Sequence, residues 1–140
     1  MKKKATIVLF AFLIGYAGCK AQDNQKAIEE AVSAAEAWLA LVDSEKYGES
    51  WDEAAEYFKG AVSRDQWIQA VESVRKPLGK ILTRELVSST YTTTLPGVPE
   101  GEYVYIEFKT TSEKNISITE TMTPELDKEG KWRISGYYIK

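Results

Sequence analysis

The hydrophobic period of the chain changes at Gly79, and this change limits the possible folds more than any other feature. Before Gly79, apolar residues recur every three or four positions, which is the spacing of one face of an α-helix. After Gly79, apolar and polar residues alternate in short runs, as in half-buried β-strands. The sequence therefore predicts an α+β domain, with helices packed on one face of an antiparallel sheet.

Three helices are predicted before Gly79. The apolar stripe of the first is Ile28, Val32, Ala35, Leu39 and Val42. The second runs from Tyr47 to about Gly60, and Ser50 and Glu53 have the spacing of a capping box that would start it.

The third predicted helix follows another capping-box spacing, Ser63 to Gln66, and ends near Pro77 and Gly79. Its apolar stripe is Trp67, Val71, Val74 and Leu78. Four strands follow, over residues 82–94, 103–108, 116–122 and 132–138. In the first, Leu82, Arg84 and Leu86 share one face, and in the second Val104, Ile106 and Phe108 do. In the third strand the residues of one face are Ile116, Ile118, Glu120 and Met122. In the fourth they are Trp132, Ile134, Gly136 and Tyr138.

The N-terminus has the three parts of an export signal. A basic run at 2–4 precedes an apolar stretch at 5–17, and small residues lead into Cys19. Residues 16–19 resemble a bacterial lipobox, so we expect a signal peptide at 1–18, acylation of Cys19, a polar tether at 19–26 and one domain at 27–140. The alternative is ordinary cleavage after Ala21, giving a periplasmic or secreted protein. Either route predicts an exported protein, membrane-anchored only if Cys19 is acylated.

Charge and composition exclude several classes of function. The chain has 140 residues, with 18 basic and 21 acidic side chains. Three of the basic ones are Lys2, Lys3 and Lys4 of the export segment, so 15 basic residues remain against 21 acidic ones, a net charge of −6. A nucleic-acid partner is therefore not expected. The chain has no histidine, so we expect no histidine-based catalytic or metal site, and we predict no catalytic residue, metal or cofactor.

The closing segment 127–140, the turn-rich 95–103, and the motifs around Trp38, Trp51 and Trp67 resemble a known family. They are similar to the bacterial domain-of-unknown-function family 4019, within the nuclear-transport-factor-two-like superfamily. The resemblance implies a cone-like fold, cystatin-like in outline, with three N-terminal helices on a curved four-stranded antiparallel sheet. It implies an exported domain and no established catalytic residues. Related cones often hold a pocket between helices and sheet.

The candidate pocket residues are Arg84, Glu120, Tyr103, Tyr105 and Trp132. Arg84 and Glu120 each share the strand phase of apolar neighbours, so both are expected on the inner wall, where a charge must be paired. They are polar anchors for a ligand, a structural ion pair, or a pair at a sheet margin that is exposed to water. A histidine-free enzyme would depend on a carboxylate or on a tyrosine such as Tyr103 or Tyr105. Its carboxylates would come from Asp43, Glu45, Asp52 and Glu53 near the first helix junction.

Three functions remain open at this stage. The preferred one is a non-catalytic binding or protein-interaction module of the cell envelope, with an envelope protein or a small ligand as partner. The second is a carrier of a small hydrophobic ligand, and the third is a histidine-free enzyme. The carrier requires a cavity lined by Leu82, Ile106, Phe108, Ile118 and Met122, whereas the interaction module requires a filled interior and an exposed apolar surface.

Overall fold

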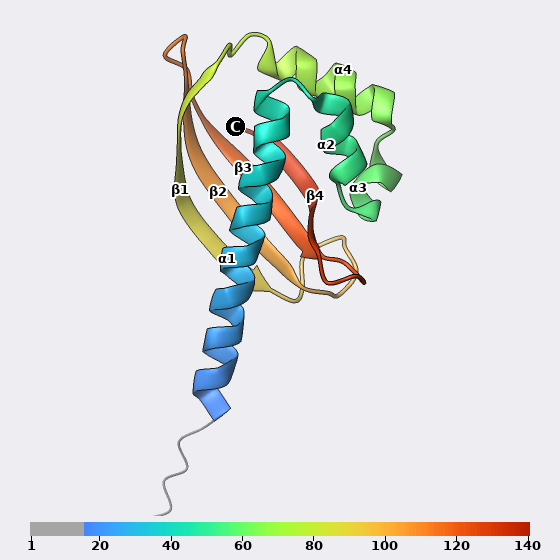
Figure 1. Ribbon diagram of the computed structural model, residues 1–140, viewed down its shortest axis with the longest axis vertical. Helices are drawn as coiled ribbons and strands as arrows, with labels where there is room; N and C mark the ends of the chain where they lie inside the picture. The colour runs from blue at the N-terminus through green and yellow to red at the C-terminus, as the bar shows by residue number, and fades with distance from the viewer. Residues whose placement is uncertain (1–15) are drawn as a thin grey trace, which may run out of the picture.

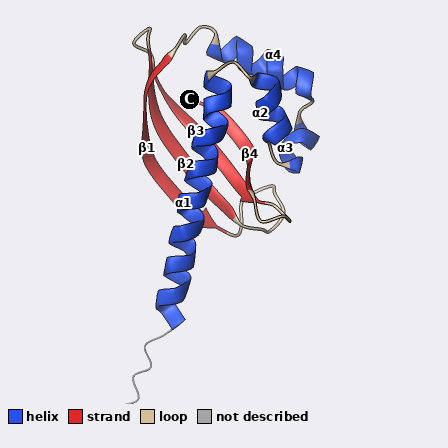
Figure 2. Ribbon diagram, in the orientation of Figure 1, coloured by secondary structure: helices blue, strands red, loops and turns tan. Residues whose placement is uncertain are grey.

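The computed structural model describes residues 16–140, with side chains from residue 23 onward. Four helices precede four strands along the chain (Figures 1 and 2). The helices are α1 (Tyr16–Asp43), α2 (Tyr47–Glu53), α3 (Glu56–Ala61) and α4 (Arg64–Arg75). The strands are β1 (Ile81–Thr92), β2 (Tyr103–Ser112), β3 (Ser117–Leu126) and β4 (Trp132–Ile139). They form one antiparallel sheet in the order β1-β2-β3-β4, so the predicted α+β class is confirmed.

Helix α1 crosses one face of the curved sheet, called here the inner face, and α2, α3 and α4 gather beside it on the β4 side (Figure 1). The core lies between α1 and the sheet. It contains Ala35 and Leu39 of α1, Ile106 and Phe108 of β2, and Met122 of β3, all at most 2% exposed. The apolar stripe predicted for the first helix therefore faces this core, as expected.

The predicted second helix is wrong in its continuity, because it is split into α2 and α3. Ala54 and Ala55 are extended, with ψ of 164° and 154°. The Ala55 N–H donates to the carbonyl of Ile134 on the edge strand β4, at 2.9 Å. This bond ties the helix break to the sheet edge. Ser50 does not cap this helix either, since it lies buried inside α2, and Gly60 lies within α3.

The third predicted helix is confirmed as α4, with one change in its buried face. Ser63 and Gln66 form the expected capping box, each side chain accepting from the backbone N–H of the other. Val74, however, is 47% exposed, whereas Arg75 is buried. The buried positions are thus Trp67, Val71 and Arg75, because steps of four keep the stripe facing the core.

Bulges alter the predicted alternation in the two edge strands. The faces expected for β2 and β3 hold, except that Ile116 precedes β3 and is exposed. In β1, the register shifts between Ile81 and Thr83, and Leu82 within that shift is 62% exposed. In β4, Ser135 has no partner on β3, because Ile134 pairs with Pro124 and Gly136 pairs with Thr123. This bulge reverses the faces to which the side chains after it point. Tyr137 consequently pairs with Met122 on the inner face, and Tyr138 lies on the outer one.

The N-terminal expectations fall partly on residues that the structure describes. Helix α1 begins at Tyr16, so residues 19–26 are helical where the polar composition predicted an irregular tether. This segment has no Gly or Pro, and Lys26 pairs with Glu30 one turn later, which favours helix. The proposed signal peptide falls mostly outside the described residues, and the side chain of Cys19 is also outside them. Within residues 16–140, no helix is both long and apolar enough to cross a bilayer.

Candidate functional site

Arg84 and Glu120, singled out from the sequence, meet on the inner face. Arg84 Nε donates to Glu120 Oε1 at 2.8 Å. Thr110, opposite Arg84 on the intervening strand β2, donates its hydroxyl to the same oxygen at 2.6 Å. Glu120 is fully buried, so these donors replace the water that an ionised carboxylate would otherwise need.

Two further charges from the helices complete this cluster. Asp43, the last residue of α1, accepts two hydrogen bonds from Arg84, at 2.7 and 3.0 Å, and one from Arg75 Nη2. Arg75 Nη1 lies 3.6 Å from Glu120 Oε2. Tyr137 donates to that same carboxylate oxygen at 2.6 Å. The charge cluster, comprising Asp43, Arg75, Arg84, Glu120 and Tyr137, therefore joins α1, α4, β1, β3 and β4.

The charge cluster is neutral overall and has no free acid or base. Burial works to raise the pKa of Asp43, but hydrogen bonds from Arg84 and Arg75 outweigh it, and the pKa is lowered. Burial raises the pKa of Tyr137, and the charge of Glu120 raises it further. Two guanidinium groups thus face two carboxylates whose four oxygens all accept hydrogen bonds or lie against a guanidinium nitrogen. Such a closed set suits a structural role better than proton transfer.

The open surface lies on the β4 side, where two grooves of about 690 Å³ each adjoin one another. The first groove lies between α1, α2 and β4. Its floor is apolar and consists of Ala34, Ala37, Trp38, Leu41, Trp132 and Ile134. Its rim is charged and consists of Glu30, Glu49, Asp52, Glu53, Lys131 and Arg133.

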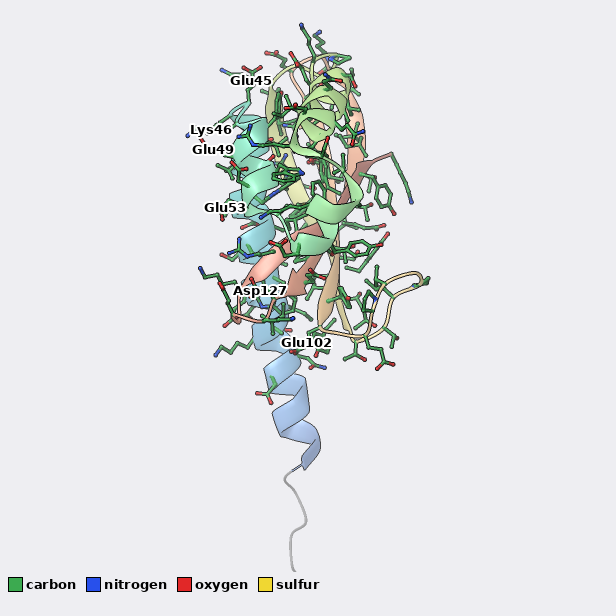
Figure 3. The ribbon with its side chains drawn as sticks, turned by 90° about the vertical axis from the view of Figure 1, so that its right-hand side faces the viewer. Glu45, Lys46, Glu49, Glu53, Glu102 and Asp127 are labelled. Carbon is green, nitrogen blue, oxygen red and sulfur yellow. The ribbon has the colours of Figure 1, made fainter. Side chains whose placement is uncertain are left out.

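The second groove lies between α3, the 99–103 segment and the 125–129 segment. It shares Asp52, Glu53 and Arg133 with the first groove, so the two form one continuous depression. Figure 3 faces this side of the molecule and shows Glu49 and Glu53 above Asp127 and Glu102. The carboxylates of α2 and of the strand ends therefore line the same side.

The two grooves hold the whole charge imbalance of the domain. Their combined lining contains ten acidic residues and four basic ones, a net charge of −6. Over residues 20–140 the totals are 21 and 15, so the remaining 11 acidic and 11 basic residues cancel. The negative potential is thus concentrated at one surface.

Two of the four basic groove residues, Arg133 and Lys59, are paired with neighbouring carboxylates. Arg133 Nε donates to Asp127 at 2.8 Å, and its Nη1 lies 3.4 Å from a Glu53 oxygen. Lys59 lies 3.6 Å from Glu56. Glu125 is only partly exposed and makes no side-chain hydrogen bond or ion pair with any residue that the structure describes. Burial, together with the charge of Asp127, raises the pKa of Glu125.

The five candidate pocket residues lie in three separate places. Arg84 and Glu120 belong to the charge cluster. Trp132 lines the first groove, and Tyr103 lines the second, where its hydroxyl donates to the Pro99 carbonyl at 2.6 Å. Tyr105 lies on the outer face, 3.3 Å from the hydroxyl of Tyr138. They do not form a single pocket.

Sequence reasoning missed Asp43, Arg75 and Tyr137 as members of the charge cluster. Arg75 carried a usable signal, because it follows Trp67 and Val71 by steps of four. Asp43 was named only as a carboxylate for a histidine-free enzyme near the first helix junction. Its ion pair with Arg84 joins residues that are 41 positions apart in the chain. Among residues with described side chains, no three carboxylate or thiol groups are placed to hold a metal ion.

Comparison with known proteins identifies a family and assigns no activity. The model of the family described as "Protein of unknown function (DUF4019)" matches residues 34–137, from the middle of α1 to β4. The match therefore includes β1, β2 and β3 in full, most of β4 and all members of the charge cluster. No curated protein and no solved structure matches the chain.

Proposed function

Because this chain belongs to the DUF4019 family of proteins of unknown function, we propose its role from geometry: a non-catalytic module of the cell envelope that binds another protein. The first groove is the proposed binding surface. The observation that carries the proposal is its apolar floor, which includes the partly exposed Trp132 and opens to solvent beside a filled interior. Aromatic side chains in a shallow apolar depression are typical anchors for protein partners.

The filled interior favours this role over a carrier of a hydrophobic ligand. Ile106, Phe108 and Met122, three of the expected cavity-lining residues, are packed into the core at no more than 2% exposure. Leu82, a fourth such residue, lies at a register shift in β1, and its side chain is exposed to solvent. The two grooves on the β4 side include none of the five expected positions, and a smaller hollow on the outer face of the sheet includes only Ile118.

The carboxylates considered for a histidine-free enzyme are not placed for acid–base chemistry. Asp43 is held by two guanidinium groups, and its pKa is lowered. The hydrogen bond from Arg64 lowers the pKa of Asp52 as well. A general acid at neutral pH needs the opposite shift. Glu53 contacts Arg133, and Glu45 lies in the turn after α1 with a φ of 61°.

Two finer features belong to the same proposal. One is the cone-like, nuclear-transport-factor-two-like arrangement, which is supported by a long helix across the inner face of a curved antiparallel sheet (Figure 2). The other is export with acylation of Cys19, which is supported by the basic run, the apolar stretch and the small residues before that cysteine. An acyl anchor would hold α1 at a membrane surface.

A photo-cross-linking experiment in the native host tests the binding role. A benzophenone amino acid placed at Ala37, in the first groove, is expected to give a discrete protein adduct under ultraviolet light. The matched control places it at Thr90, an exposed position on β1. Ala34→Trp, which fills the groove, is expected to abolish the Ala37 adduct. Equal labelling from Ala37 and Thr90 would overturn the proposal.

Mass spectrometry of protein purified from its host tests the carrier alternative and the anchor together. Native spectra are expected to show the protein without a bound small molecule, and denaturing spectra a chain that begins at Cys19 with added acyl mass. A small molecule that appears only in the native spectrum would favour the carrier. A chain beginning at Gln22 would show a free periplasmic or secreted protein.

A further inference from the structure

We propose that the partner segment bound by this surface is cationic and amphipathic: an apolar side chain on the floor of the first groove, and Lys or Arg side chains against the acidic second groove. This inference rests on the proposed binding role and names the chemistry of the partner. It follows from three properties of the grooves.

The first property is the apolar floor. Ala34 and Ala37 are small, so α1 leaves room there, and Leu41 and Trp132 add larger apolar surfaces to the floor. A floor of this kind is stabilised by covering it with an aliphatic or aromatic side chain. The carboxylates therefore border a depression whose apolar floor favours an apolar side chain as its occupant.

The second property is charge complementarity. The groove lining carries the full net charge of −6, while charges elsewhere in the domain cancel. A partner with Lys or Arg residues is attracted specifically to this side, and anionic partners are repelled from it. The remaining 11 acidic and 11 basic residues cancel, so the net attraction for a cationic segment comes from the groove lining.

The third property is a groove carboxylate, that of Glu125, which has no hydrogen-bond or ion-pair partner among the described residues. Arg133 is already bound between Asp127 and Glu53, and Lys59 is beside Glu56. Glu125, by contrast, is partly buried and has no partner among the described residues. An incoming ammonium or guanidinium group would compensate its desolvation. Because the two grooves share Asp52 and Glu53, one extended segment can reach both.

The experiment titrates the full mature chain with a synthetic peptide of alternating Lys and Leu, and monitors backbone amide resonances by NMR. Peptides with Glu in place of Lys, and with acetylated Lys, are the controls. The Lys-Leu peptide is expected to shift resonances lining the two grooves, with affinity that falls as salt is raised. The two control peptides are expected not to bind.

Two charge-matched triple variants separate a specific surface from general attraction. The groove triple is Glu49→Gln, Glu56→Gln and Glu129→Gln, and the control triple is Glu36→Gln, Glu72→Gln and Glu85→Gln. All six side chains are exposed, so both proteins are expected to fold. The groove triple is expected to weaken peptide binding by about tenfold, and the control triple by less than about twofold.

The possible outcomes distinguish this inference from the proposed function. Equal weakening by both triples, or equal binding of the Glu-Leu peptide, overturns the cationic partner. The cationic partner is also overturned if the protein binds calcium, the groove triple abolishes that binding, and the Lys-Leu peptide does not bind. If the Ala37 adduct forms in the host and the groove triple leaves it unchanged, the binding role stands and the cationic chemistry fails. If no adduct forms at Ala37, both fail.

Discussion

Arg84 Nε lies 2.8 Å from Glu120 Oε1, although their strands, β1 and β3, are separated by β2. The long guanidinium side chain spans the intervening strand over Thr110, which donates to the same carboxylate. Arg75 and Asp43 bring the ends of α4 and α1 to this point. The charge cluster therefore fixes how the helices sit on the sheet, and its loss is expected to affect the whole fold.

We expect Glu120→Ala to lower the free energy of unfolding by about 3–5 kcal/mol, because Arg75 and Arg84 would keep their burial and lose a carboxylate. Urea denaturation followed by circular dichroism measures the change. The control is Glu85→Ala, an exposed position on β1, with an expected change within about 0.5 kcal/mol. Equal effects of the two substitutions would contradict a stabilising role for the cluster.

Alkaline pH is expected to destabilise the protein through Tyr137. Burial raises the pKa of this phenol above its usual value of about 10, so the unfolded chain releases the proton first. Its stabilising contribution is complete below about pH 10 and is lost as pH rises from there towards the folded pKa. Urea midpoints measured from neutral pH to about pH 11 are expected to fall less steeply for Tyr137→Phe than for the wild type.

Tyr138→Phe is the control for the alkaline effect. Tyr138 is 47% exposed, and its hydrogen bond with Tyr105 lowers its own pKa while raising that of Tyr105, so the two contributions to the slope oppose each other. Loss of the Tyr138 hydroxyl is therefore expected to leave the alkaline decline close to that of the wild type. Parallel pH profiles for Tyr137→Phe and the wild type would show that Tyr137 is not the group responsible.

The elements that sequence periodicity predicted correctly are those whose side chains meet the core directly. Both inner strands, β2 and β3, alternate as expected because neighbours flank them on each side and hold the register. The capping box at Ser63 formed because both of its hydrogen bonds are local. The Arg84–Glu120 ion pair was expected because each of these charged residues lies on the same strand face as its apolar neighbours, where a charge must be paired.

The features that could not be predicted depend on contacts between distant segments. The break at Ala54 and Ala55 is stabilised by a carbonyl of β4, about eighty positions later in the chain. The bulge at Ser135 reverses the last strand next to Pro124, which has no N–H to give to a ladder. The grooves are assembled from four or more separate segments, so Trp132, Tyr103, Asp52 and Glu53 were named as candidates beforehand, but not as parts of one surface.

Two glycine substitutions are expected to have opposite effects. Gly79, between α4 and β1, has a φ of +71°, and a Cβ there would lie 2.5 Å from Glu113 Oε1. Gly79→Ala is therefore expected to lower the free energy of unfolding by about 1–2 kcal/mol. Gly60 lies inside α3 with open space around it, so Gly60→Ala is expected to raise stability by about 0.5–1 kcal/mol. Thermal denaturation of both variants checks the pair, and stabilisation by Gly79→Ala would contradict it.

Ser50 is expected to be the most sensitive small residue in the helical layer. It is fully buried, accepts from Trp67 Nε1 at 2.9 Å and donates to the Tyr47 carbonyl at 2.6 Å. Ser50→Ala leaves the buried indole N–H without its acceptor, so the free energy of unfolding is expected to fall by about 1–3 kcal/mol. Urea denaturation followed by tryptophan fluorescence measures this loss.

Ser73→Ala is the matched control for Ser50→Ala, because Ser73 also donates to a carbonyl three residues earlier in its helix, at 2.8 Å, but is exposed. Water replaces that bond, and alanine favours helix, so a change within about 0.5 kcal/mol is expected. Trp67→Phe removes the indole N–H that Ser50→Ala would leave without an acceptor. In the Trp67→Phe background, Ser50→Ala is therefore expected to lower the free energy of unfolding by less than it does in the wild type. An equal cost in both backgrounds would show that the indole–hydroxyl bond does not stabilise this layer.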